Sequence, residues 1–316
     1  MKYLHGVRTF LEWWRSTGQD GDVTTMDVDL YLSSWESSWK EQTGGPPSRS
    51  TARARIAALK SFFDYLARAS TGPFKNPMAG VIAPTVEQKP NDFLRPVEDA
   101  ALLECEAPAA EHLVVWLLRW TGLRVSEACG LRLQDLDLTP GGESLLVRKS
   151  KTTAGVRTIP VVPTLLPELE TWLESLRSRG IASPQAYVLA TATGGAFKPS
   201  FVWRLVKRAG ARAGVRPIEC GCGSMMKTRH DRGCPQTVSG ENVSEITPHT
   251  LRRTFGSYLL NKGLRLEVVS RLLGHSSTVV TERAYAELLG STIRDELLSV
   301  LDDQSEAVDR TPPRVA

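Results

Sequence analysis

Helical periodicity runs through most of this chain, and one proline-rich stretch interrupts it. Apolar residues recur at helical spacing over 4–16 and again over 48–70. Between 76 and 96 prolines recur and few helical periods remain. The 316 residues are enough for two domains of ordinary size. The interruption therefore predicts a linker between two domains, each with its own core.

The first domain is predicted to be entirely helical. A second helix follows the first, with Thr25 as its expected N-cap and Asp27 in its first turn. The segment TGGPPS ends that helix, and a serine or threonine just after it is expected to cap the third. We place the divisions at 1–83 for this domain, 84–91 for the linker, 92–300 for the second domain with an insert at 218–245, and 301–316 for a disordered tail.

The second domain is predicted to be mostly helical with one small antiparallel sheet. The segments SLLVRKSK and GVRTIPVV are rich in Val, Ile and Thr and flank a turn at 153–155, which is typical of a β-hairpin. Helical patterns precede and follow them. The fold class is therefore mainly α, with a helical first domain and a mixed α/β second domain.

Charge and hydropathy favour a cytoplasmic protein without a membrane segment. No apolar run approaches the roughly 20 residues that span a bilayer, and the first residues lack the apolar stretch of a signal peptide. The net charge of +4 is mild, but basic residues gather at 49–60, 148–157 and 198–216. One such cluster is usually a solvated surface. Three of them around the segments described next favour a groove that faces phosphates.

Six residues in the second domain suit one chemical task, which is to hold a phosphodiester while a tyrosine attacks it. Fixed guanidinium groups stabilise the negative charge that spreads over the phosphate oxygens in the transition state. Arginine, lysine and histidine side chains supply that environment, and a phenol supplies the nucleophile. The set is Arg124, Lys151, His249, Arg252, His275 and Tyr285.

Each member has a role in this hypothesis. Lys151 lies at the expected hairpin tip and could protonate the leaving 5′-oxygen, as could Lys149 two residues away. Tyr285 needs a base, because an unperturbed phenol has a pKa of about 10. His249 is the candidate base, and His275 would donate a hydrogen bond to a phosphate oxygen.

Each residue taken alone also has an ordinary explanation. An arginine after a turn is usually a surface residue, a tyrosine on an amphipathic helix usually packs, and a histidine at a helix start is usually a cap. Their joint occurrence in segments of matching form favours the catalytic interpretation.

Those segments resemble the signature boxes of a known family. TGLRVSEACGLRLQDLD, HTLRRTF, LGHSS and the tyrosine that follows resemble the tyrosine recombinases, also called phage integrases. The resemblance covers nearly the whole chain, with 1–83 similar to the core-binding (SAM-like) DNA-binding domain and 92–300 similar to the catalytic domain. It assigns catalytic roles to Arg124, Lys151, His249, Arg252, His275 and Tyr285. It also implies that Glu127 helps to hold the turn around Arg124.

The resemblance implies a site-specific DNA recombinase or integrase. Such an enzyme cuts duplex DNA through a 3′-phosphotyrosine, rejoins it through a Holliday junction, and requires neither ATP nor a cofactor for catalysis. Four protomers would assemble on two sites, with accessory proteins compatible with the scheme. The stretch STIRDELLSVL resembles a terminal helix that docks on a neighbour, although packing on its own domain fits equally well.

Two other functions compete with this interpretation. A type IB topoisomerase shares the chemistry, but the helical first domain and the His249 segment favour a recombinase. A DNA-binding accessory protein that does not cut has no need for Tyr285. The sequence is compatible with phage integration, transposon mobilisation and resolution of replicon dimers.

The chain departs from its relatives in the position of the tyrosine. Tyr285 follows His275 by ten residues, one more than in many relatives. An extra residue within a helix rotates the phenol by about 100°, whereas the loop at 276–280 could absorb it without effect.

The insert before His249 is the second departure. It contains Cys220, Cys222, His230 and Cys234 in the spacing C-x-C-x7-H-x3-C, which offers the ligands of a structural zinc site. The alternative is a flexible glycine-rich loop with incidental cysteines. Any zinc here would be structural and would take no part in catalysis.

DNA contacts are expected in both domains. The third helix begins with arginines where acidic residues would suit the helix dipole, which points to an anion nearby. The candidates are Arg49, Arg53, Arg55 and Lys60 in the first domain and Lys198, Arg204 and Lys207 in the second.

Overall fold

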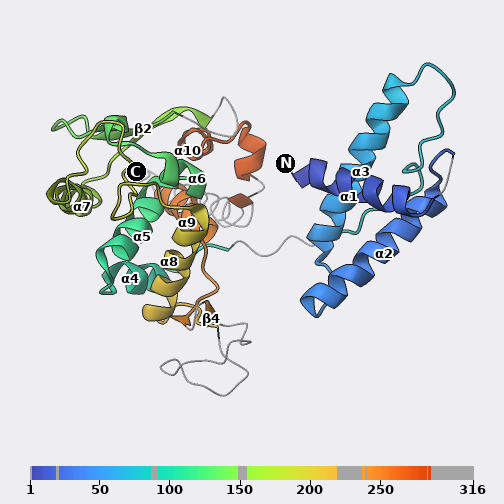
Figure 1. Cartoon of the computed structure of the whole chain (residues 1–316). Coiled ribbons are helices and arrows are strands. Elements are labelled where there is room, and N and C mark those ends of the chain that lie inside the picture. Colours follow the sequence, from blue (N-terminus) through green and yellow to red (C-terminus); the bar gives the residue numbers. More distant parts are fainter. Residues whose placement is uncertain are drawn as a thin grey trace, which may run out of the picture. The chain divides into compact units, whose positions relative to one another are not determined.

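The computed structural model divides the chain into two compact units, residues 1–89 and 90–316 (Figure 1). Each unit has its own buried apolar cluster. The structure describes residues 2–18, 21–86, 92–148, 155–218, 237–238, 241–282 and 284–285.

The first unit is a bundle of three helices, α1 (Lys2–Ser16), α2 (Thr25–Thr43) and α3 (Arg49–Ala69). Its core is aromatic. Phe10 on α1 meets the ring of Tyr31 on α2 edge-on at 5.1 Å and the ring of Phe63 on α3 at 5.6 Å. Edge-to-face packing of this kind adds to the free energy gained by burial, so three rings from three helices hold the bundle together.

Helix α2 begins one residue earlier than the sequence indicated. Thr24, and not Thr25, is the N-cap, and its hydroxyl accepts a hydrogen bond from the amide of Asp27 at 3.3 Å. The Asp27 carboxylate in turn accepts from the Thr24 amide at 2.8 Å. Such a capping box needs the acidic residue three positions after the cap, and only Thr24 satisfies that spacing.

The second unit is built around helix α5 (Ala109–Thr121), which packs against α7 (Leu166–Ser178), α8 (Pro199–Arg212) and α9 (Pro248–Asn261) (Figure 1). The buried face of α5 includes Leu113, Val114 and Leu117. A helix that is covered on several sides is apolar over most of its circumference, which explains the sequence AAEHLVVWLLRWT. The remaining helices are α4 (Pro96–Glu104), α6 (Val125–Gly130) and α10 (Leu266–Leu273).

A three-stranded antiparallel sheet in the order β1-β2-β3 covers one side of this unit. Strands β2 (Ser144–Val147) and β3 (Arg157–Pro160) pair with Leu145 opposite Ile159, and both side chains are buried. Strand β1 (Leu136–Asp137) was not expected, because two residues are too few to show an alternating pattern. Two further short strands, β4 (Thr237–Val238) and β5 (Glu241–Asn242), pair with each other.

The observed architecture confirms the predicted fold class, which is mainly helical with a small antiparallel sheet. The strands flanking the expected hairpin turn are also confirmed, although only Gly155 of that turn lies within the described residues. Within the described residues, none of the helices combines the length and the apolar character that crossing a membrane requires.

Candidate active site

The turn between α5 and α6 places Arg124. Gly122 ends α5 with a left-handed φ of 60°, and a Cβ there would lie 2.4 Å from the ring of Phe255. Glycine is therefore required here for two reasons: the left-handed backbone conformation and the close approach of the Phe255 ring. Arg124 then becomes the N-cap of α6, and its amide and guanidinium donate to the Glu127 carboxylate at 2.9 and 2.8 Å.

Glu127 is a buried carboxylate shared by two arginines. Its side chain is 1% exposed and also accepts from Arg157 Nη2 at 3.1 Å. Burial by itself would raise the pKa of Glu127. Hydrogen bonds from Arg157 and from the Arg124 amide outweigh that effect and hold the pKa at about 2. Glu127 is therefore ionised at neutral pH and can fix both arginines, in keeping with the supporting role expected for it.

The start of α9 positions His249 and Arg252. Thr247 is the N-cap and Pro248 occupies the first turn, which suits proline because it has no amide hydrogen to leave unpaired. His249 and Arg252 then lie about one turn apart. Arg252 is 4% exposed, and its Nη1 donates to the Gly122 carbonyl at 2.6 Å while Nη2 donates to the Leu273 carbonyl.

Burial shifts the pKa of Arg252 as well. Desolvation, followed by the charge of Arg124, lowers the pKa of Arg252 to about 9. The group remains protonated at neutral pH. A buried cation that lies near a second cation is stabilised by any anion that arrives, so the arrangement favours a phosphate between the two guanidinium groups.

The end of α10 is where the arginines converge. Gly274 closes this helix with a left-handed φ of 64°. Arg124 Nη2 donates to the Gly274 carbonyl at 2.8 Å, next to the Leu273 carbonyl that Arg252 binds. His275 follows immediately. The two arginines of the TGLR and HTLRR segments therefore meet at the LGH segment, although about 150 residues of sequence separate the first from the last.

Both histidines are neutral at pH 7. Desolvation and then the charges of Arg253 and Arg252 lower the pKa of His249, whose side chain stays open to solvent. Burial, followed by the charges of Arg252 and Arg124, lowers the pKa of His275 to about 4. The Nδ1 atom of His275 lies 2.7 Å from the hydroxyl of Thr281, so one of its two ring nitrogens is already in a hydrogen bond.

Tyr285 lies on a helical segment that begins at Thr278, inside the stretch 276–280 that was expected to be a loop. Its side chain is 2% exposed and packs with Phe255 and Val269. The phenol rests on Gly256, where an added Cβ would lie 2.1 Å from the hydroxyl oxygen. Burial raises the pKa of Tyr285 to about 12, despite the opposing charges of Arg252 and Arg253. The phenol is therefore sheltered and protonated.

The structure thus brings five of the six predicted catalytic residues into one region. Arg124, Arg252 and His275 meet at the end of α10, His249 lies a turn before Arg252, and Tyr285 packs on α9 about a turn after it. The sixth, Lys151, lies outside the described residues, as does Lys149. The four predicted zinc ligands at 220, 222, 230 and 234 also lie outside them.

Arg157 belongs to this region and was missed by sequence reasoning. It contacts Glu127 and the carbonyl of Leu272. The only signal was a basic residue within the apolar strand RTIP, since a charged side chain there must face either solvent or a buried partner.

The predicted DNA contacts of the first unit differ in their surroundings. Arg49, Arg53 and Lys60 on α3 are exposed. Arg55 instead stacks on the ring of Trp35 at 4.7 Å and donates to the Tyr31 hydroxyl at 2.9 Å. Arg55 therefore has contacts inside the bundle, and its contact with DNA stays a prediction.

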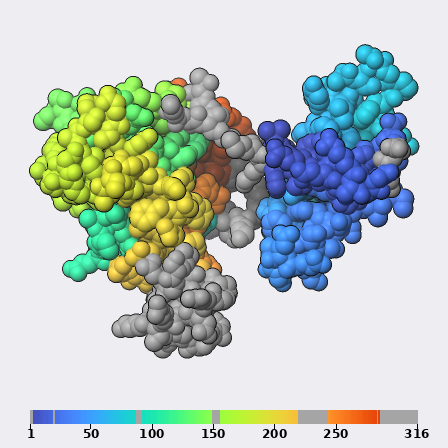
Figure 2. Space-filling view, in the orientation of Figure 1, coloured from blue at the N-terminus to red at the C-terminus, as the bar shows by residue number. Residues whose placement is uncertain are grey.

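Helix α8 carries the predicted contacts of the second unit. Figure 2 shows this helix, in yellow, on the surface of the unit. Lys198 and Arg204 are exposed, and Trp203 between them is 38% exposed. Lys207 is half-buried and donates to the Ser244 carbonyl at 2.7 Å. It therefore holds the segment before α9 to α8, and its contact with DNA also stays a prediction.

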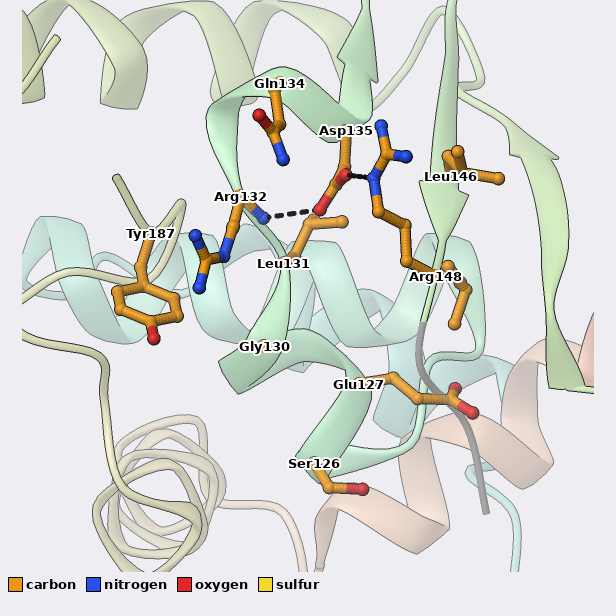
Figure 3. Close-up of a pocket in the computed structure, with 11 residues that line it drawn as sticks. Ser126, Glu127, Gly130, Leu131, Arg132, Gln134, Asp135, Leu146, Arg148 and Tyr187 are labelled. Atoms are coloured by element: carbon orange, nitrogen blue, oxygen red, sulfur yellow. Dashed lines mark hydrogen bonds and ion pairs between the residues drawn. The ribbon is translucent and has the colours of Figure 1, made fainter. Parts of the chain in front are cut away.

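A cavity of about 370 Å³ lies between α6 and strand β2, and its lining includes Ser126 and Glu127 of α6 and Leu146 of β2 (Figure 3). On its walls Arg148 pairs with Asp135, and the guanidinium of Arg132 lies 5.3 Å from the ring of Tyr187. These contacts fix the outer end of β2 against the segment that follows α6.

Comparisons with known proteins agree with this geometry. The sequence model of the phage integrase family matches residues 96–290. A tyrosine recombinase of Pseudothermotoga lettingae is 31% identical over 264 residues, which cover 83% of this chain and 79% of that protein. A tyrosine recombinase of Thermosipho africanus is 26% identical over 88% of this chain and 85% of that protein.

Solved structures show the same fold. The Tn1549 transposon integrase in complex with transposon right end DNA has a TM-score of 0.64 at 20% identity, covering 94% of this chain and 92% of that one. A lambda integrase dimer bound to a core site has a TM-score of 0.59 at 19% identity, covering 89% and 69%. With more than half of its length matched by the family model, this chain belongs to the phage integrase family and is a tyrosine recombinase, an enzyme that cleaves DNA and rejoins it.

Proposed function

We propose that Arg124 and Arg252 hold the scissile phosphate of duplex DNA and that Tyr285 attacks it. The observation that carries this proposal is the convergence at the end of α10, where two guanidinium groups from distant segments lie beside a neutral imidazole. Arginine forks match the geometry of phosphate oxygens. The tyrosine Oη–P bond forms as the P–O5′ bond breaks, giving a 3′-phosphotyrosine and a free 5′-hydroxyl.

Proton transfers accompany this step. The phenol must lose a proton, and His249 is the proposed acceptor because its lowered pKa keeps it neutral at physiological pH. The leaving 5′-oxygen must gain a proton. Lys151 is the proposed donor on the strength of the family resemblance, with Lys149 as the alternative.

His275 is proposed to donate to a non-bridging phosphate oxygen. If the Thr281 hydroxyl donates to Nδ1, then the proton of the neutral ring lies on Nε2. That tautomer leaves an N–H on Nε2 as the donor for a phosphate oxygen. Thr281 is fully buried, so its hydroxyl needs a partner and His275 supplies one.

Cleavage requires Tyr285 to move. In the structure its phenol is covered and lies on Gly256, so no phosphate can reach it there. We therefore propose that the segment from Thr278 to Tyr285 shifts when DNA binds, carrying the hydroxyl toward the guanidinium groups. The resting position protects the enzyme from cutting in the absence of its assembled substrate.

Strand exchange is proposed to follow from the same chemistry. A 5′-hydroxyl from a partner duplex attacks the phosphotyrosine, and a second round through a Holliday junction completes recombination among four protomers on two sites. XerH and the Tn1549 integrase were solved on DNA substrates, which supports duplex DNA as the partner here. The proposed DNA contacts are Arg49, Arg53, Arg55, Lys60, Lys198, Arg204 and Lys207.

Three further expectations remain proposals. The protein acts in the cytoplasm, and a mobile genetic element is the proposed setting, for which the likeness to a transposon integrase gives some support. The Cys/His set of the insert is proposed to bind structural zinc, and the zinc content of the purified protein, with Cys222→Ser as comparison, tests that proposal.

Capture of covalent protein–DNA adducts tests the nucleophile. Host cells expressing the wild type, Tyr285→Phe or the control Tyr258→Phe are lysed under denaturing conditions, and the attached DNA is sequenced. Tyr258 lies on α9 but is 37% exposed and outside the cluster. Adducts from the wild type and Tyr258→Phe, and none from Tyr285→Phe with DNA affinity retained, are expected. Adducts from Tyr285→Phe would refute the assignment.

A further inference from the structure

A third arginine holds the end of α10, and the proposed chemistry gives it no role. Arg157 lies on β3, and its side chain is 7% exposed. Its Nε donates to the carbonyl of Leu272 at 2.6 Å. Burying a guanidinium costs free energy unless its donors are hydrogen-bonded. The partners of Arg157 therefore indicate its role.

Three consecutive carbonyls at this helix end each bind a different arginine. Leu272 accepts from Arg157, Leu273 accepts from Arg252, and Gly274 accepts from Arg124. The last carbonyls of a helix have no partner within the helix and carry the negative end of its dipole. The end of α10 is therefore a template that fixes three guanidinium groups side by side.

Arg157 connects several elements of the second unit. Its Nη2 donates to Glu127 on α6 at 3.1 Å, and its Nη1 donates to the carbonyl of Gly155 at 2.8 Å. One side chain thus joins the end of α10, the carboxylate that holds Arg124, and the start of β3. Loss of these contacts would free Glu127 from one of its two arginines and leave the Leu272 carbonyl without this donor.

Gly274 leaves the space that Arg157 occupies. A Cβ at Gly274 would lie 2.7 Å from Arg157 Nη1 and 3.0 Å from its Cζ. The glycine between the helix and His275 is thus required by the guanidinium as well as by its left-handed φ. The absence of a side chain at Gly274 therefore allows the Arg157 guanidinium to pack against the LGH segment.

We propose that Arg157 is a positioning residue that sets the geometry of Arg124 and Arg252 for transition-state stabilisation. The proposal rests on the proposed function, in which those two arginines hold the scissile phosphate. Arg157 itself is too deeply buried to meet the DNA. It acts through Glu127, which it shares with Arg124, and through the end of α10, which it shares with both.

A lysine cannot replace this arginine. Arg157 uses Nε, Nη1 and Nη2 in different directions, to Leu272, Gly155 and Glu127 respectively. An ammonium is a single point with three donors and cannot span those partners. Arg157→Lys keeps the charge and most of the volume but loses the fork, which makes it the informative variant.

Arg148→Lys is the matched control. Arg148 lies at the end of the partner strand β2 and pairs with the buried carboxylate of Asp135, as Arg157 pairs with Glu127. It is 51% exposed, and Asp135 lies in the segment that follows α6, which is not the end of α10. The same substitution there removes an arginine–carboxylate pair without disturbing the template.

The first measurement is single-turnover cleavage of a nicked duplex that traps the phosphotyrosine, together with the melting temperature and DNA affinity. For Arg157→Lys we expect a rate constant about 100-fold below wild type, since small displacements of positioned groups have effects of that order. Affinity and the final yield of adduct should stay near wild type. A purely structural role would lower the yield through unfolded protein and leave the rate constant of the folded fraction unchanged, which would overturn the proposal.

A neutral substrate separates positioning of the guanidinium groups from other effects. A methylphosphonate at the scissile position lacks the charged oxygen that Arg124 and Arg252 stabilise. The loss in Arg157→Lys should shrink there to less than about 10-fold, while the ratio of Arg148→Lys to wild type should be the same on both substrates. An equal loss on both substrates for Arg157→Lys would overturn the proposal.

Arg252→Lys distinguishes this inference from the proposed function. If Arg252→Lys cleaves at the wild-type rate, the proposed phosphate-binding role fails and the inference about Arg157 fails with it. If Arg252→Lys is impaired and Arg157→Lys is not, the proposed function stands and only the positioning role of Arg157 is refuted.

Discussion

Replacing Gly256 by alanine should displace the phenol of Tyr285, the proposed nucleophile, from its buried position. A Cβ at this position would lie 2.1 Å from the Tyr285 hydroxyl oxygen and 2.5 Å from Cζ. Real atoms do not approach so closely, and Gly256 belongs to a helix whose backbone is held by its own hydrogen bonds. The contact is with the hydroxyl and ring of a side chain, whereas the backbone of α9 is held by helical hydrogen bonds, so we expect the tyrosine to move and the helix to stay in place.

The pKa of Tyr285 gives the size of the effect. Burial raises the pKa to about 12 from an ordinary value of about 10, which corresponds to about 3 kcal/mol of extra free energy for ionising the phenol. Release to solvent should remove most of that penalty and raise the tyrosinate fraction at a fixed pH by up to about 100-fold. Adduct formation on a nicked duplex should rise in the same direction, by about 10-fold or more.

Alkaline titration of tyrosinate ultraviolet absorbance measures the shift directly. The chain has six tyrosines, and subtracting the curve of Tyr285→Phe isolates one of them. The wild-type step should lie near pH 12 and the Gly256→Ala step near pH 10. In the wild type the folded state keeps a proton that the unfolded state loses, so stability should fall as pH rises from about 10 to about 12, and Gly256→Ala should lack that decline.

Gly210→Ala is the control for overpacking. Its Cβ would also clash, at 2.6 Å from the side chain of Ile246, but on α8 and away from the tyrosine. Both variants should lose some stability, since overpacking costs about 1–3 kcal/mol. Only Gly256→Ala should shift the phenol and raise adduct yield. The reasoning is refuted if Gly256→Ala still titrates near pH 12 and cleaves as the wild type does.

Two further predictions concern the histidines. Thr281→Val keeps the shape of the side chain but removes the hydroxyl next to His275 Nδ1. Cleavage should slow by roughly 5- to 10-fold, because one hydrogen bond contributes about 1 kcal/mol. A single-turnover rate equal to that of Ser276→Ala, the control at an exposed position, would contradict the tautomer assignment. The acid limb of the rate should have its midpoint below pH 6.5, the ordinary value for histidine, because burial and the nearby arginines lower the pKa of His249. A midpoint above pH 6.5 would exclude His249 as the base.

Local signals were sufficient to predict the elements that carry the site. Thr247 and Pro248 mark the start of α9, which fixes the spacing of His249 and Arg252. The Val, Ile and Thr content of SLLVRKSK and GVRTIPVV on either side of a turn indicated the paired strands. The convergence of Arg124 with the LGH segment came from the family resemblance, since nothing in the periodicity brings residues that far apart in sequence together.

Contacts between distant segments set the features that the sequence did not reveal. Arg55 and Lys207 looked like surface cations, yet Tyr31 and the Ser244 carbonyl bind them within their units. Arg157 looked like an ordinary strand residue and instead joins three elements. The shelter of Tyr285 depends on Gly256, 29 positions earlier, where the absence of a side chain is the functional feature. These contacts depend on which face of a helix or strand packs against its neighbour, and residue type alone does not determine that face.

The manner in which Arg252 is held bears on how the site works. Both of its hydrogen bonds in the described part of the chain go to backbone carbonyls, those of Gly122 and Leu273. A carboxylate in their place would fix the guanidinium equally well but would neutralise it, and a phosphate would then have to displace or share that charge. Carbonyl dipoles at a helix end orient the cation and leave its net charge available. Desolvation makes that charge less favourable and lowers the pKa of Arg252, so a bound phosphate would offset the free-energy cost of burying the guanidinium.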